Sequence, residues 1–267
     1  MMQDDNEPTV QSRRTIAALS RELGRPDRDW AILAEGNTSM ALGDGRMLVK
    51  ASGVSMETAL PEDFLTLGIG ETLQLVDSPG GGDDEVRALF DAAAVSHRRP
   101  SVEALLHAVC LGLPGVDVVG HTHPIPVNAL LCSPRASALT DGSLFPDQIV
   151  VLGVKQLLVP YIDPGLRLAQ VVRSMLREHV AETGAPPKVI YLRNHGMFAL
   201  GASDREVLQI TEMAVKVARV ILGALAAGGP VYLEPEHVAR IDTRPDELLR
   251  RTVLSRDAHA EQEGVTL

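Results

Sequence analysis

The spacing of apolar residues along the chain predicts several helices. In the N-terminal stretch, Ile16, Leu19 and Leu23 would share one helix face. Gly24 follows them and suits the end of that helix, because glycine readily adopts the left-handed conformation that closes many helices. Helices are expected at residues 10–23, 101–113 with Ser101 as N-cap, 128–131, 163–183 and 203–227, the last opened by a capping box of Ser203 and Glu206.

Short apolar runs between these helices predict strands. The Gly43-Asp44-Gly45 segment separates two such runs and indicates a hairpin turn. The segment 78–84 is rich in glycine and aspartate and is expected to be a loop. Strands are expected at residues 39–42, 46–50, 65–69, 72–76, 116–119, 149–152, 157–159, 189–192 and 197–200, with 65–69 and 72–76 forming a second hairpin.

The alternation of helices, strands and hairpins predicts one α/β domain with a mostly antiparallel or mixed sheet. No internal repeat or linker divides the chain. We expect the domain to cover residues 10–233, after a disordered start at 1–9 and before a helical, polar tail at 234–267. The chain has no G-x-G-x-x-G motif, which argues against a dinucleotide-binding fold.

The charge and the aromatic content exclude one class of partner. The formal net charge is −10, from 25 basic and 35 acidic residues. Proteins that bind nucleic acid usually carry a basic patch, and single strands are bound by stacking on aromatic rings. Because aromatic residues make up only 3% of this chain and no basic run occurs, we expect no nucleic-acid partner.

The cysteines and the N-terminus predict a cytoplasmic protein. Cys110 and Cys132 lie in apolar surroundings and neither belongs to a C-x-x-C pair, so we expect two reduced thiols. The first six residues are polar or acidic and do not resemble a signal peptide. No apolar run approaches the roughly 18–20 residues that a membrane-spanning helix needs. We therefore expect no membrane partner.

Three histidines form a candidate metal site. His121 and His123 follow an apolar run two positions apart, so in a strand both side chains face the same side. Their Cα atoms would lie roughly 6–7 Å apart, which lets both imidazoles reach one ion at about 2.0–2.1 Å. His195 lies at the end of another predicted strand, beside Gly196, and is the candidate third ligand. The alternative is that these are surface loop histidines.

The remaining histidines do not group in this way. His107 follows Glu103 by four residues and shares its helix face, so it either lines the site or has a structural role. The others are expected to be solvated surface residues, namely His97, His179, His237 and His259.

Five motifs occur in the order Gly36-Asn37-Thr38-Ser39, Lys50-Ala51-Ser52-Gly53, Pro100-Ser101-Val102-Glu103, His121-Thr122-His123 and Asn194-His195-Gly196. In this order they resemble the class II aldolase/adducin family, which includes the fuculose-phosphate and rhamnulose-phosphate aldolases. The resemblance spans about residues 30–225. The first two motifs are most similar to the aldolase half of the larger rhamnulose-phosphate aldolase/dehydrogenase proteins.

The resemblance implies a three-layer α/β/α domain with a sheet of the nine-stranded type. It also implies a homotetramer with active sites near subunit interfaces. The implied metal is zinc, bound by His121, His123 and His195, and the implied acid/base is Glu103. The implied substrate-binding residues, which would cradle a phosphate, are Gly36, Asn37, Lys50, Ser52, Gly53 and Ser101.

The implied chemistry agrees with general principles. Zinc would act as a Lewis acid on substrate oxygens, and a neighbouring carboxylate would move a proton. Backbone N–H groups and hydroxyls of small residues suit a phosphate, and Lys50 would add a positive charge. Imidazole ligands would accept Mn²⁺, Co²⁺ or Fe²⁺ as well as zinc.

The chain departs from the family pattern at positions that concern the phosphate. Val102 replaces a serine, Ala41 stands where an arginine is usual, and Ala51 follows Lys50 in place of a threonine-proline pair. A carboxylic acid or an unphosphorylated sugar is therefore an alternative substrate. No tyrosine lies in a matching motif, so the proton-donating tyrosine of some relatives is not assigned; the chain has Tyr161, Tyr191 and Tyr232.

The leading functional hypothesis is a zinc-dependent class II aldolase that cleaves or forms a carbon–carbon bond in a ketose 1-phosphate or related sugar. A metal-dependent epimerase, dehydratase or decarboxylase on the same scaffold is the alternative within the enzymes. Similar epimerases carry aspartate where Glu103 stands, which favours the aldolase. A non-catalytic scaffold similar to the adducin head domain is the alternative of another class, and the three histidines with Glu103 argue against it.

Overall fold

The computed structural model describes residues 7–247 and residue 249 of the chain. Its centre is a seven-stranded sheet with the order β3-β2-β1-β4-β7-β6-β5. Neighbouring strands are antiparallel except β5 and β6, which are parallel, so the sheet is mixed. The strands are β1 (Asn37–Ala41), β2 (Arg46–Lys50), β3 (Phe64–Gly68), β4 (Val118–Thr122), β5 (Leu157–Val159), β6 (Val189–Leu192) and β7 (Gly196–Gly201).

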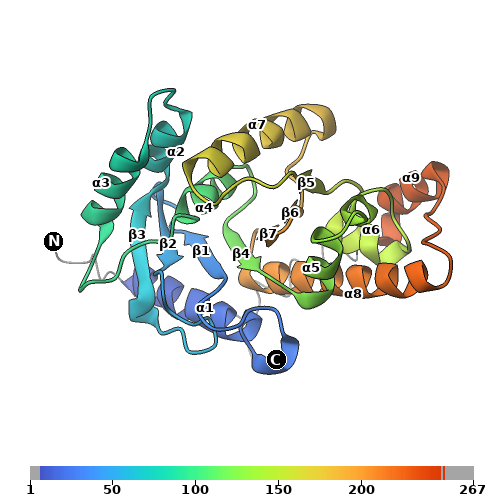
Figure 1. Cartoon of the computed structure of the whole chain (residues 1–267), viewed down its shortest axis with the longest axis horizontal. Helices are drawn as coiled ribbons and strands as arrows, with labels where there is room; N and C mark the ends of the chain where they lie inside the picture. Colours follow the sequence, from blue (N-terminus) through green and yellow to red (C-terminus); the bar gives the residue numbers. More distant parts are fainter. Residues whose placement is uncertain (1–6, 248, 250–267) are drawn as a thin grey trace.

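Helices cover both faces of this sheet (Figure 1). The α-helices are α1 (Glu7–Leu23), α2 (Ile69–Asp77), α3 (Asp83–Ala93), α4 (Ala104–Leu111), α5 (Ile125–Leu131), α6 (Pro146–Leu152), α7 (Leu166–Thr183), α8 (Asp204–Ala226) and α9 (Pro235–Thr243). Short 3₁₀ turns occur at η1 (Pro26–Arg28), η2 (Pro61–Asp63) and η3 (Ala136–Leu139).

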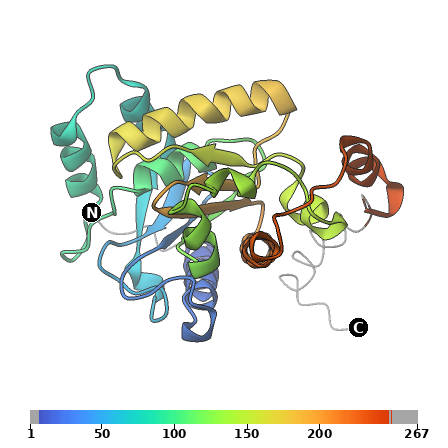
Figure 2. The same ribbon diagram turned by 45° about the vertical axis from the view of Figure 1, so that its right-hand side comes forward.

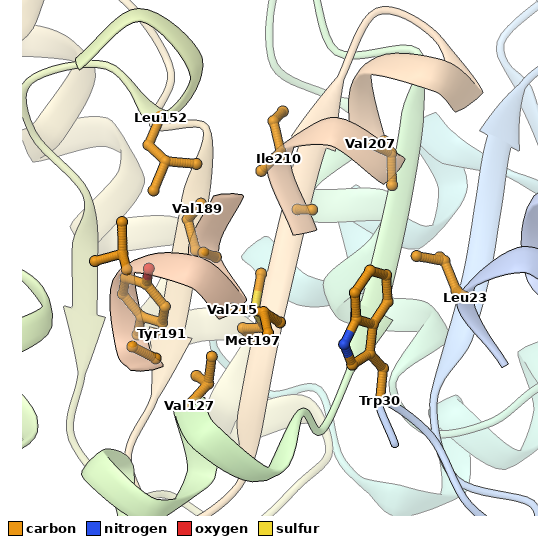
Figure 3. Close-up of a cluster of buried hydrophobic side chains, with 14 of the residues drawn as sticks. Leu23, Trp30, Val127, Leu152, Val189, Tyr191, Met197, Val207, Ile210 and Val215 are labelled. Carbon is orange, nitrogen blue, oxygen red and sulfur yellow. The ribbon is translucent and has the colours of Figure 1, made fainter. Parts of the chain in front are cut away.

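Two hydrophobic clusters make this a three-layer structure. One cluster joins the sheet to α1, α5, α6 and α8, and part of it, around Trp30, Tyr191 and Met197, is drawn in Figure 3. The other cluster joins the opposite face to α2, α3, α4 and α7. Figure 2 shows the strands lying between α7 and α8. The expected α/β/α architecture with a mixed sheet is therefore confirmed, with seven strands among the described residues instead of nine.

Two strand predictions are wrong because short apolar runs do not distinguish a strand from a buried helix. Residues 72–76 belong to α2, where the buried Thr72 and Val76 are four residues apart and share a helix face. Residues 149–152 belong to α6, which starts at Pro146 after an extended Phe145. Pro146 suits a helix start because its missing N–H would be unpaired there in any case.

Several predicted boundaries also shift. Helix α1 begins at Glu7, so residues 7–9 are helical instead of disordered. The loop predicted to end at 84 gives way to α3 at Asp83. Helix α4 is shorter than expected, and Glu103 instead of Ser101 occupies its N-cap position, without a side-chain cap. In the tail, α9 is helical as expected, whereas residues 248 and 250–267 lie outside the described part.

The other predicted elements are present, although β4 covers Val118–Thr122 instead of 116–119 and α7 begins at Leu166 instead of 163. The Gly43-Asp44-Gly45 turn joins β1 to β2, and Ser203 caps α8 by accepting a hydrogen bond from the Glu206 backbone N–H at 3.2 Å. Within the described residues, no helix combines the length and the apolar character that crossing a membrane would require.

Candidate metal centre

Strand pairing brings the three predicted histidines together. His121 lies near the end of β4, His123 follows directly after it, and His195 lies in the turn between β6 and β7. Strand β4 pairs with β7 so that His121 is opposite Phe198, which places the β6–β7 turn beside the end of β4. One ring nitrogen of each histidine lies within 4.8 Å of those of the other two.

The hydrogen bonds of two rings leave their lone pairs directed at each other. His121 Nδ1 donates to the Met197 carbonyl at 3.0 Å, and His123 Nδ1 donates to Glu35 Oε2 at 3.0 Å. Because both acceptors require an N–H, the Nε2 atom of each neutral ring carries a lone pair. These two Nε2 atoms lie 2.9 Å apart. Two facing lone pairs repel each other unless a cation lies with them, so the donor set fits a divalent metal ion.

The pKa of His123 is consistent with a neutral metal ligand. Burial, followed by the neighbouring His121, lowers the pKa of His123 to about 4, and the bond to Glu35 opposes this only in part. The ring is therefore uncharged at neutral pH, as metal binding requires.

Glu103 lies against the same cluster. Its Oε1 atom is 3.2 Å from His121 Nε2 and 2.9 Å from His195 Nε2. Burial acts to raise the pKa of Glu103, but protons on the neighbouring His121 and His195 rings, whose place a bound cation would take, hold it well below its usual range. A carboxylate held ionised at this place can contribute a fourth metal ligand or accept a proton from a molecule bound beside the metal.

Glu35 completes the cluster and was not among the predicted site residues. One of its oxygens accepts the bond from His123 Nδ1, and the other accepts the Ile32 backbone N–H at 2.8 Å. Carboxylates that hold the second nitrogen of a ligand histidine fix its tautomer and ring orientation. The only signal in the sequence was a glutamate directly before the Gly36-Asn37 motif, and nothing there links it to His123.

Two glycines allow the close approach of the segments that carry the site. A Cβ atom at Gly196 would lie 2.4 Å from His123 Cδ2 and 2.7 Å from the Thr122 carbonyl oxygen. Gly36 has a φ of +70°, and a Cβ atom there would lie 2.8 Å from the His121 carbonyl oxygen. Any larger residue at either position would therefore displace a segment that carries a candidate metal ligand.

The predicted substrate-binding residues lie in strand ends and loops next to Glu103. Asn37 starts β1, and its Nδ2 donates to Glu103 Oε2 at 2.7 Å. The exposed Ser52 and Gly53 follow β2, and the bridge between Ala51 and Pro100 places this turn beside Ser101. Ser101 Oγ accepts the Glu103 backbone N–H at 3.3 Å.

Lys50 is a buried lysine at the end of β2. It is 1% exposed, and its Nζ donates to the carbonyl oxygens of Ala51 at 3.2 Å and Val54 at 2.5 Å. Burial lowers the pKa of Lys50 to about 8, although Glu103 and Asp63 oppose the shift. Its ammonium group therefore anchors the turn that carries Ser52 and Gly53.

The other histidines differ in their surroundings. His107 is fully buried on α4, beside the site. His97 and His237 are exposed as expected, but His179 is 5% exposed, so its prediction as a solvated residue is wrong. It lies on α7, and the apolar face of that helix is packed on the sheet. His259 lies outside the described residues.

Comparisons with known proteins identify relatives of this chain. The sequence pattern of the class II aldolase and adducin N-terminal domain matches residues 14–222. A methylthioribulose-1-phosphate dehydratase of Geobacillus kaustophilus is 26% identical over 74% of this chain and 84% of its own length. A 3-oxo-tetronate 4-phosphate decarboxylase of Haemophilus influenzae is 25% identical over 76% of this chain and 84% of its own length. The uncharacterized oxidoreductase YuxG of Bacillus subtilis is 27% identical over 68% of this chain, which spans only 26% of that protein.

Solved structures share the fold. YgbL of Klebsiella pneumoniae, described as a putative aldolase/epimerase/decarboxylase, superposes with a TM-score of 0.66 at 23% identity, covering 87% of this chain and 98% of that one. An L-fuculose 1-phosphate aldolase superposes with a TM-score of 0.63 at 17% identity, covering 89% of this chain and 95% of that one.

Proposed function

This chain belongs to the class II aldolase and adducin family, and from that premise we propose that it is a metal-dependent lyase whose ion is bound by His121, His123 and His195. The observation that carries the proposal is the convergence of ring nitrogens of His121, His123 and His195 within 4.8 Å of one another, with Glu103 beside them. Three imidazoles around one ion, with a coordination position left open, are typical of catalytic zinc sites. Zinc is therefore the proposed ion, and Mn²⁺, Co²⁺ and Fe²⁺ are the other metals that these ligands accept.

The proposed reaction is the cleavage of a carbon–carbon bond in a ketose 1-phosphate or related sugar, or its formation in reverse. The bound ion would supply Lewis acidity to the substrate oxygen on which negative charge develops. Glu103 Oε1 lies at the cluster, so the carboxylate is placed to move the proton between substrate oxygen or carbon and solvent. Asn37 holds Glu103 Oε2 and so limits its rotation.

The proposed substrate-binding group comprises Gly36, Asn37, Lys50, Ser52, Gly53 and Ser101. Lys50 supports a phosphorylated substrate because it brings a buried positive charge to the turn that carries Ser52 and Gly53. The dehydratase and the decarboxylase relatives, by their names, also act on phosphorylated compounds. We further propose the homotetramer that the family resemblance implies.

A second candidate function is dehydration or decarboxylation of a phosphorylated keto compound. The specific observation in its favour is the similarity to the dehydratase and the decarboxylase, each matched over 84% of its length. Like aldol cleavage, both reactions break a bond at a carbon next to a carbonyl group. In all three, negative charge develops on the oxygen of that carbonyl. The same ion and the same carboxylate would therefore serve all three.

Metal analysis combined with a substrate panel tests the proposal. The purified protein is analysed for its elements and then assayed with ketose 1-phosphates, their unphosphorylated forms, methylthioribulose 1-phosphate and 3-oxo-tetronate 4-phosphate. Release of dihydroxyacetone phosphate and an aldehyde supports the aldolase, whereas loss of water or of carbon dioxide supports the second candidate. A folded protein that binds no metal and turns over none of these compounds would support a non-catalytic, adducin-like scaffold instead.

A further inference from the structure

A chain of buried polar side chains leads from the core of the protein to Glu103. Ser39 Oγ lies 2.7 Å from His107 Nδ1, His107 Nε2 is hydrogen-bonded to Asn37 Oδ1, and Asn37 Nδ2 lies 2.7 Å from Glu103 Oε2. Ser39, His107 and Asn37 are each at most 4% exposed. Apolar side chains cannot serve as hydrogen-bond partners, so these buried polar groups rely on one another for their hydrogen bonds.

The hydrogen bonds in this chain can run in only one direction. An ionised carboxylate only accepts hydrogen bonds, so Asn37 must present its NH₂ group to Glu103 and its oxygen to His107. His107 Nε2 must therefore carry the proton, which leaves Nδ1 to accept from the Ser39 hydroxyl. Burial, followed by the neighbouring His121, lowers the pKa of His107 to about 3, which agrees with a neutral ring of this single tautomer.

This direction decides how Glu103 faces the metal ligands. Oε2 is held by Asn37, so Oε1 is the oxygen that lies 2.9 Å from His195 Nε2 and 3.2 Å from His121 Nε2. If the Asn37 amide turned over, its oxygen would face the carboxylate and repel it. Among the described residues, the Asn37 amide is hydrogen-bonded to Glu103 on one side and to His107 on the other, so the N–H of His107 opposes that turn from the interior side.

We propose that His107 is a positioning residue, which fixes the Asn37 amide and through it directs Glu103 Oε1 at the metal cluster. The inference rests on the proposed role of Glu103 as the acid/base. His107 touches neither the metal position nor the substrate position, and it acts only through Asn37. A purely structural histidine would need no particular tautomer and no carboxylate at the end of its hydrogen-bond chain.

The first experiment needs no substrate. In zinc-loaded protein labelled with ¹⁵N in its histidines, nuclear magnetic resonance should show His107 as the neutral Nε2–H tautomer, with an imidazole proton that exchanges slowly with water. His107→Leu identifies the signal by its disappearance, or Ser39→Ala by a shift if the leucine variant does not fold. An Nδ1–H tautomer or a charged ring would overturn the proposal whatever reaction the protein catalyses.

The second experiment measures turnover of the compound identified by the substrate panel. His107→Leu should bind the same amount of zinc with unchanged KM but lose roughly 100-fold in kcat, the order of loss expected when a reacting group is misplaced by about 1 Å. His107→Gln should recover most of that loss, because its side-chain NH₂ can take the place of Nε2–H. His179→Leu, which removes a buried histidine on α7 whose charged neighbours are Lys155 and Glu182, should keep its turnover.

A double-variant cycle separates this role from general damage. In a Glu103→Gln background, adding His107→Leu should lower kcat no further, because residues that act as a unit are not additive. Additive losses, or a glutamine variant no better than leucine, would overturn the proposal. If Glu103→Gln alone leaves kcat unchanged, the proposed role of Glu103 fails, while the tautomer experiment still decides whether His107 holds Asn37.

Discussion

The histidine cluster and the proposed substrate-binding group are built in different ways. His121 and His195 are placed by paired strands, and the rings of His121 and His123 are oriented by acceptors at 3.0 Å. In the substrate-binding group, by contrast, Ser52 and Gly53 are exposed in a turn after β2. Their position depends on backbone bonds to the neighbouring loop, such as that from Ser52 N to the Arg99 carbonyl at 2.9 Å.

This difference indicates where the site is preorganised. The rings of His121 and His123, two of the three proposed metal ligands, are oriented by hydrogen-bond acceptors before any ion binds, so the loss of a ligand should abolish metal binding. The turn after β2, which we propose to bind the phosphate, has one fixed charge, on Lys50, and exposed neighbours, so single substitutions there should change affinity only moderately. The predictions below test this contrast, from the largest expected effect to the smallest.

Replacing a metal ligand should have the largest effect. His123→Ala removes one of three imidazoles, and zinc content measured by elemental analysis should fall from about one ion per chain to almost none. Activity should be lost with it, while the oligomer measured by light scattering persists. His97→Ala, which changes an exposed histidine, is the matched control. Full zinc occupancy in His123→Ala would show that the ligand assignment is wrong.

Replacing the proposed acid/base should abolish turnover without removing the metal. Glu103→Gln keeps the shape of the side chain and its bond to Asn37 but cannot accept a proton. We expect kcat to fall by about 10²–10⁴, the usual contribution of a positioned acid/base, with zinc content retained. Glu178→Gln on the exposed side of α7 is the control. Undiminished turnover would remove Glu103 from the mechanism.

Replacing Glu35 should weaken metal binding without abolishing it. Glu35→Ala leaves His123 Nδ1 without its acceptor, and the dissociation constant for zinc, measured by competition with a chelator, should rise by about 10–100-fold. Glu35→Gln retains an acceptor oxygen without the charge, so its loss should be smaller. Glu57→Ala, at an exposed position, is the control. Equal zinc affinity in Glu35→Ala, Glu35→Gln and Glu57→Ala would mean that Glu35 does not hold the His123 ring.

Features that depend on residues close together in the sequence, such as turns and helix caps, could be predicted from the sequence. The Gly43-Asp44-Gly45 turn and the Ser203 cap depend on neighbours along the chain, and both are present. The grouping of the histidines was predictable because His121 lies in β4, His123 follows that strand directly, and His195 follows another strand. The conformation of the short apolar runs at 72–76 and 149–152 could not be predicted, because tertiary packing decided between helix and strand.

The contacts that orient the site could not be predicted, because they join residues far apart in the sequence. Glu35 and His123 are separated by 88 positions, and His107 and Asn37 by 70. No pattern in one sequence indicates that such side chains meet. The same limit explains why His107 was left open between a lining and a structural role, and why His179 was taken for a surface residue.

The smallest expected effect is a pH dependence of substrate affinity that depends on Lys50. Burial lowers the pKa of Lys50 from 10.5 to about 8, so its ammonium charge is present at pH 7 and is lost as pH rises through 8. If that charge attracts the phosphate, KM for the phosphorylated substrate should rise by about tenfold, or 1.4 kcal/mol, between pH 7 and 9. Lys50→Met should have the higher KM at both pH values and little change between them, whereas Lys216→Met, at an exposed position on α8, should behave as the unmodified protein does. Because an unphosphorylated substrate carries no charge for Lys50 to attract, the same pH change should leave its KM unaltered. A parallel rise for both substrates would show that the turn responds to pH in some way other than through the phosphate.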